Sequence, residues 1–221
     1  VANADGSDAR QVTDLPGANW APFFHPAGRR ILFASNHHAL AGPGGGREFA
    51  IFAVNLDGSG LEQVTHSGTF EAFPMFSPDG RQIAYVRNPQ LPGSQLRLMT
   101  SLGGSDRTLS DLPGLRRLAW SPDGRYIAAG VYGSGQAVKG DARERNGIHL
   151  IPVAGGKARA LTTPTQPGAD NAPAFSPDGR RLAYASCTGT LFRANCDVHV
   201  LDLDPSFSAA APSRRLTRQA A

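Results

Sequence analysis

The hexapeptide Phe76–Arg81, with the sequence FSPDGR, decides the fold of this chain because it recurs along it. It returns as WSPDGR at Trp120–Arg125 and as FSPDGR at Phe175–Arg180, and a diverged copy, FHPAGR, stands at Phe24–Arg29. The four copies are 52, 44 and 55 residues apart. Self-similarity at such a period is the signature of a repeat architecture.

Each copy has the residues of a tight reversal between two strands. Proline fixes its own φ near the value that a type I turn requires, and glycine supplies the left-handed position that follows. Apolar runs such as Gln82–Val86 follow each copy, and a short apolar run precedes it. Every hexapeptide is therefore predicted to be the tip of a β-hairpin.

Two further strands are expected in each unit, as in Ala50–Asn55 and Leu61–Thr65. Four strands in roughly 40 to 55 residues is the period of a β-propeller blade. No stretch shows sustained helical periodicity, so the sequence predicts an all-β chain of four-stranded antiparallel blades.

The strand count predicts about four and a half blades, which is an incomplete ring. Residues 1–13 match the third and fourth strands of a blade whose first two strands are absent, which makes them a half blade. Whole blades are expected at residues 18–66, 70–110, 115–163 and 170–218. An open ring would expose unpaired strand edges, so more blades or flanking domains of the same polypeptide are expected.

The Ser-Pro-Asp-Gly-Arg turns, with strand ends such as Gln63-Val64-Thr65, resemble the repeat of TolB-like β-propellers. That repeat is similar to the WD40 repeat, with Pro-Asp in place of Trp-Asp, and the likeness covers essentially the whole chain. The resemblance implies a non-catalytic scaffold for protein or peptide recognition in the bacterial periplasm or envelope. It leaves open a propeller that gates a prolyl-oligopeptidase-type peptidase, or the outer sensor domain of a membrane-anchored kinase or transcription regulator.

Enzyme signatures are missing from the sequence. It contains no Gly-x-Ser-x-Gly elbow, His-Glu-x-x-His pair, phosphate loop or dinucleotide fingerprint, so we expect no catalytic residues and no cofactor in this segment. The glycine-rich stretch at residues 42–46 is read as a loop. Adjacent His37 and His38 would point in opposite directions on an extended chain, so no metal site is expected.

Charge and hydropathy exclude two further classes. The net charge of +4 comes from scattered arginines rather than a basic run, so no nucleic-acid partner is expected. Apolar runs are only a few residues long, so this segment is not expected to insert into a membrane.

The two cysteines, Cys187 and Cys196, flank one predicted hairpin loop as cross-strand neighbours. This placement suits a disulfide, which would indicate an oxidising compartment. The alternative is two small apolar residues at strand ends. A metal site needs more ligands than this pair provides.

Propeller geometry points to candidate binding residues. The first strand of each blade lines the central channel, and the residues where these strands begin should surround its mouth. The polar or aromatic residues at these positions are Asn19, Trp20, Glu71, Arg116, Asp170 and Asn171. Such a ring could receive a peptide segment or a cation; the alternative is that these side chains are solvated loop ends.

Overall fold

The structure, a computed structural model, describes residues 1–42, 46–89, 93–131, 146–164, 168–188 and 195–218. It confirms the all-β prediction: the described residues form four antiparallel sheets of four strands, each sheet built from strands consecutive in the chain. We call these sheets blades 1 to 4. The middle of the glycine-rich stretch at residues 42–46 and the inner part of the loop between the two cysteines lie outside the described residues.

The strands of the first two blades have the following bounds. Blade 1 comprises β1 (Asn19–Phe24), β2 (Arg30–Ser35), β3 (Ala50–Asn55) and β4 (Glu62–Gln63). A short 3-10 helix, η1 (His37–Ala39), follows β2. Blade 2 comprises β5 (Glu71–Phe76), β6 (Gln82–Arg87), β7 (Gln95–Thr100) and β8 (Arg107–Ser110).

The other two blades follow the same plan. Blade 3 comprises β9 (Leu115–Trp120), β10 (Tyr126–Val131), β11 (Ile148–Pro152) and β12 (Arg159–Ala160). Blade 4 comprises β13 (Gly168–Phe175), β14 (Arg181–Thr188), β15 (Asn195–Asp202) and β16 (Arg214–Arg215). In every blade the recurring hexapeptide connects the first strand to the second.

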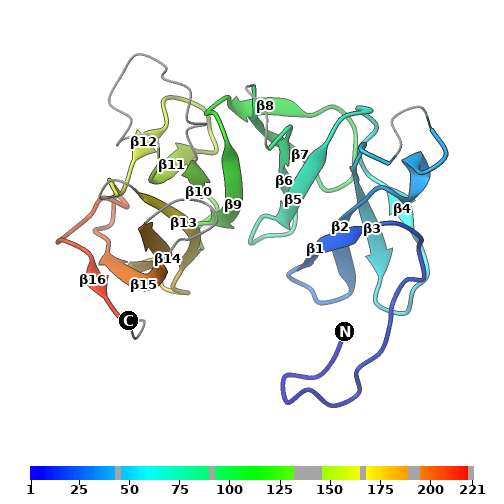
Figure 1. Ribbon diagram of the computed structural model, residues 1–221, viewed down its shortest axis with the longest axis horizontal. Coiled ribbons are helices and arrows are strands. Elements are labelled where there is room, and N and C mark those ends of the chain that lie inside the picture. The colour runs from blue at the N-terminus through cyan, green and yellow to red at the C-terminus, as the bar shows by residue number, and fades with distance from the viewer. Residues whose placement is uncertain (43–45, 90–92, 132–145, 165–167, 189–194, 219–221) are drawn as a thin grey trace.

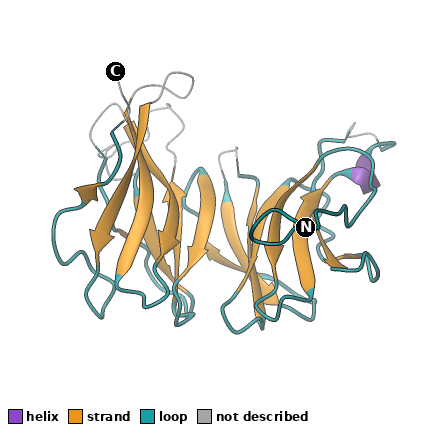
Figure 2. Cartoon of the chain, turned by 90° about the horizontal axis from the view of Figure 1, so that it is seen from below, coloured by secondary structure: helices purple, strands orange, loops and turns teal. Residues whose placement is uncertain are grey.

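The blades stand side by side in an open arc, with the first and last blades on either side of the opening (Figure 1). Their strands run between the same two ends of the molecule, where the loops gather (Figure 2). Apolar clusters fill each space between neighbours: Leu32 of blade 1 with Ile83 of blade 2, Leu98 with Leu115, and Leu150 with Leu182. Full burial of one such side chain contributes about 2 kcal/mol, so these interfaces hold the arc together.

The hairpin tips are closed by their own side chains. In blade 2 the hydroxyl of Ser77 donates to Asp79 Oδ1 at 2.6 Å, and the same oxygen accepts the backbone N–H of Arg81 at 3.0 Å. The corresponding bonds recur in blades 3 and 4. In blade 1, where Ala27 replaces the aspartate, the backbone N–H of Ala27 donates to His25 Nδ1 at 3.1 Å. The recurring aspartates therefore build turns.

The N-terminal segment differs from the expected half blade. The structure assigns no strand to residues 1–13, and the first strand begins at Asn19. Instead, Val1 and Arg10 exchange two backbone hydrogen bonds of 2.8 Å, and Val12 packs with Leu15 against the outer face of blade 1. In a complete blade the third strand also pairs with the second strand. No second strand of this kind lies beside residues 1–13 among the described residues.

Candidate functional site at the channel mouth

The predicted mouth residues lie where the innermost strands begin. Asn19, Glu71 and Leu115 are the first residues of β1, β5 and β9, and Asp170 is the third residue of β13. Their direct partners on the second strands are Ser35, Arg87, Val131 and Ser186, in the same order. The structure thus places these four residues at equivalent positions in the four blades.

Two of these side chains do not face solvent. Glu71 is 0% exposed and Asp170 is 2% exposed, whereas Asn19 is exposed and accepts a hydrogen bond of 2.6 Å from the Ser35 hydroxyl. The Glu71 carboxylate points toward Arg87 on the second strand of its own blade, and the Asp170 carboxylate bonds to Ser186 on its own second strand and to Thr162 of blade 3. Glu71 and Asp170 are therefore not exposed at the mouth, and a binding role for the six mouth residues stays a prediction.

Each innermost strand contains a left-handed residue shortly after its mouth residue. Two positions after each mouth residue, the non-glycine residues Ala21, Phe73, Arg117 and Ala172 have φ between 50° and 55°. The strand pairing shifts register at the same place in every blade. Such a bulge changes which residues of the strand face the core, and each left-handed alanine or larger residue costs about 1–2 kcal/mol.

This strain predicts opposite effects of glycine at two exposed alanines of β13. Ala172→Gly relieves a positive φ of 51°, whereas Ala174, which has no positive φ, gains only backbone freedom in the unfolded state. We expect Ala172→Gly to be more stable than Ala174→Gly by about 1–2 kcal/mol in urea unfolding. Equal stabilities would contradict the strained geometry.

The carboxylate of Glu71 belongs to a polar network within blade 2. Arg87 Nε donates to Glu71 Oε1 at 2.9 Å, and Arg87 Nη2 donates to Asp106 Oδ2 at 3.0 Å. Asp106 also accepts from Arg97 Nε at 2.7 Å and from the Tyr85 hydroxyl. Two arginines thus neutralise two carboxylates, and Arg87 and Arg97 are mostly buried.

The network predicts how stability depends on pH. The pKa of Asp106 lies well below its ordinary 3.8, mainly because Arg97 donates a hydrogen bond to the carboxylate. This effect outweighs burial, which acts in the opposite direction. Since the folded-state pKa is depressed, the stabilisation is present at neutral pH and is lost as the pH falls through the folded-state value. We expect Asp106→Asn to lower the free energy of unfolding by about 2 kcal/mol at pH 7, and by progressively less below about pH 4. Urea unfolding across this range measures the difference; a constant difference would contradict the assignment.

Four partly exposed aromatic side chains lie together at the mouth between blades 1 and 2. We call Trp20, Phe49, Phe70 and Phe73 the mouth aromatic cluster. The ring centroid of Trp20 lies 5.9 Å, 6.1 Å and 5.2 Å from those of the three phenylalanines, in their sequence order. All four are half-buried. The sequence pointed only to Trp20, because Phe49, Phe70 and Phe73 lie outside the two strand-start positions that recur in each blade.

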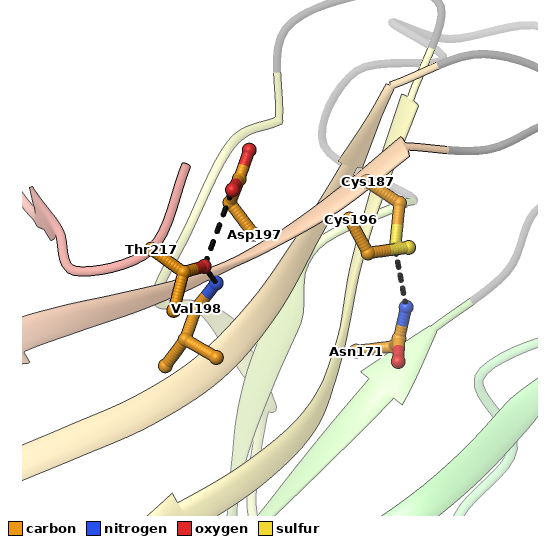
Figure 3. Close-up of a disulfide and its surroundings, with 6 residues drawn as sticks. All are labelled: Asn171, Cys187, Cys196, Asp197, Val198 and Thr217. Atoms are coloured by element: carbon orange, nitrogen blue, oxygen red, sulfur yellow. Dashed lines mark hydrogen bonds between the residues drawn. A yellow bond between two sulfur atoms is a disulfide. The ribbon is translucent and has the colours of Figure 1, made fainter. Parts of the chain in front are cut away.

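The other predicted residues lie toward blades 3 and 4. Arg116 and Asn171 are half-buried, and the Asn171 side-chain amide donates to Cys187 Sγ at 3.4 Å (Figure 3). Cys187 and Cys196 form a disulfide between directly opposed residues of β14 and β15, with 4.0 Å between their Cα atoms. Closing so short a loop contributes about 2–3 kcal/mol.

The described part of the chain contains no group of three or more His, Cys, Asp or Glu side chains placed to hold a metal ion. Among the same residues, no helix has the length and apolar character needed to cross a membrane.

Four-stranded blades set side by side about one axis define a β-propeller, and comparison with known proteins agrees. Curated relatives include the uncharacterized peptidase YuxL of Bacillus subtilis, 31% identical over 55% of this chain, and a TolB homolog of Chlorobium luteolum, 30% identical over 80%. The crystal structure of TolB from Acinetobacter baumannii superposes over 98% of the chain with a TM-score of 0.71 at 18% identity. No protein-family model matches the chain.

The chain is a TolB-like β-propeller. It spans 22% of the peptidase, 36% of the Chlorobium homolog and 47% of the Acinetobacter structure.

Proposed function

We propose that this propeller is a non-catalytic platform that binds a protein or peptide at its mouth, in the bacterial envelope. The mouth aromatic cluster carries the proposal. Its rings contact one another across two blades and stay partly exposed, and exposed Asn19 lies beside Trp20. Rigid aromatic side chains that combine apolar area with an accessible edge dominate the energetics of protein recognition.

The likeness to TolB homologs supports a role in binding rather than in bond making. The disulfide supports the envelope, since such bonds persist in oxidising compartments. Fractionation of cells that carry the tagged full-length protein tests the location, and recovery in the cytoplasm would contradict it.

Peptide selection tests the binding role. Peptides selected from a displayed library on the purified wild-type chain are then measured against Trp20→Ala and against Leu102→Ala, a control that removes a side chain 96% exposed in the β7–β8 turn. We expect Trp20→Ala to weaken binding at least about ten-fold and Leu102→Ala to leave it unchanged. Thermal melting checks that both variants fold. Undiminished binding by Trp20→Ala would place recognition elsewhere.

A second candidate is a propeller attached to a peptidase domain of the same polypeptide. The match to the Bacillus peptidase favours it. Peptide hydrolysis by the full-length product, lost when the serine of a downstream Gly-x-Ser-x-Gly elbow is replaced, would support this role. A full-length product without such an elbow would remove it.

A further inference from the structure

Blades 2 and 4 have polar residues at the same five positions. Strand pairing makes the following pairs of residues equivalent: Glu71 and Asp170, Tyr85 and Tyr184, Arg87 and Ser186, Arg97 and His199, Asp106 and Ser213. Contacts agree with this correspondence. Tyr85 donates to Asp106 in blade 2, and a hydrogen bond joins Tyr184 to Ser213 in blade 4. His199 Nδ1 lies 3.4 Å from the Ser213 hydroxyl, in the place of the contact between Arg97 and Asp106.

The two guanidinium groups of blade 2 have no equivalent in blade 4. Two arginines neutralise the carboxylates of blade 2, but serine and histidine stand at their positions in blade 4. The carboxylate of Asp170 remains. A permanent guanidinium therefore faces Glu71 and none faces Asp170 among the described residues.

A cavity of about 520 Å³ occupies this place between blades 3 and 4. Its polar lining includes Thr162, Asp170, Tyr184, Ser186, His199 and Ser213.

Asp170 is the unbalanced group in the cavity wall. It is 2% exposed, and its Oδ1 has no hydrogen-bond partner among the described residues. The hydroxyls of Thr162 and Ser186 donate to the carboxylate, and burial raises its pKa. A buried carboxylate oxygen without a partner is costly, and a cationic donor that reaches it removes that cost.

We propose that this cavity binds a guanidinium group, which takes the place that the Arg87 side chain occupies in blade 2. A guanidinium presents several N–H donors in one plane and suits a carboxylate flanked by hydroxyl and ring groups better than a compact ammonium does. In blade 2 the Arg87 guanidinium carbon lies 5.9 Å from the centre of the Tyr85 ring, and Tyr184 provides the equivalent ring in the cavity. This proposal holds whether or not the mouth aromatic cluster binds a protein or peptide.

Direct titration tests the proposal with small probes. By calorimetry, agmatine and N-acetyl-arginine amide are expected to bind the wild-type chain saturably, with butylamine at least about ten-fold weaker. Asp170→Asn is expected to abolish agmatine binding. A peptide with one central arginine separates the two sources of the group: tighter binding than agmatine indicates a protein partner, and weaker binding indicates a small guanidino compound.

Ser186→Arg supplies the guanidinium from the chain itself and recreates the arrangement of blade 2. We expect this variant to melt at a higher temperature than Ser186→Met, a control of similar length without charge, and to lose agmatine binding. The gain should vanish in Ser186→Arg combined with Asp170→Asn. Absence of saturable agmatine binding to the wild-type chain, or equal binding by Asp170→Asn that melts cooperatively, would overturn the proposal.

Discussion

Replacing Arg87 by methionine is expected to lower the free energy of unfolding by about 3–5 kcal/mol, since it leaves a buried carboxylate without its cation. Glu71 is 0% exposed and has no other ion-pair partner among the described residues, and Asp106 loses one of its two arginines. Methionine preserves most of the side-chain volume, so the loss reports charge rather than a cavity. Urea unfolding at pH 7 measures it.

Two further variants serve as controls for this result. Arg81→Met removes an exposed arginine of a hairpin tip and is expected to cost less than about 1 kcal/mol. Glu71→Leu combined with Arg87→Met should recover part of the loss, because no buried charge is then left at that pair. A loss in Arg87→Met no larger than in Arg81→Met would show that the pair contributes little to stability.

Gly147→Ala is expected to destabilise the fold by about 2–3 kcal/mol through overpacking. A Cβ at this position would overlap the backbone carbonyl oxygen of Thr162, which cannot move without disturbing the β11–β12 pairing. Since Thr162 also donates to Asp170, the same variant should weaken the binding of agmatine in the cavity between blades 3 and 4. Chemical unfolding and agmatine titration measure the two effects.

Gly130→Ala is the matched control. This glycine is also buried in blade 3, but its added Cβ would meet its nearest neighbours at 3.3 Å, which small shifts accommodate. We expect a loss of less than about 1 kcal/mol. Equal losses in the two glycine variants would contradict the close contact at Thr162.

The fold was readable from the sequence because the turns are local. Each hexapeptide fixes its own reversal through proline, glycine and a short polar side chain, so the strands on either side follow from it. Residues 1–13 show the limit of this reasoning. They have the composition of two strands, but a strand also needs a neighbour, and sequence similarity alone does not provide one.

The site was less predictable because it depends on register. The position of Asn19, Glu71 and Asp170 at strand starts followed from the spacing, but not that Glu71 and Asp170 are buried while Asn19 is exposed, nor that a left-handed residue follows two positions later in each strand. Alanine, phenylalanine and arginine at that position carry no signal of positive φ. The pairing of Glu71 with Arg87 also crosses 16 residues, so it appears only once the strands are aligned.

The self-contained hairpin tips also bear on how the chain reaches its native state. The bonds that close each tip span two to five residues, so a tip forms without waiting for distant parts of the chain. Folding therefore has several equivalent starting points, and their order of assembly is set by which neighbouring sheets meet first. Damage to one tip should slow the maturation of its own blade while the others still nucleate.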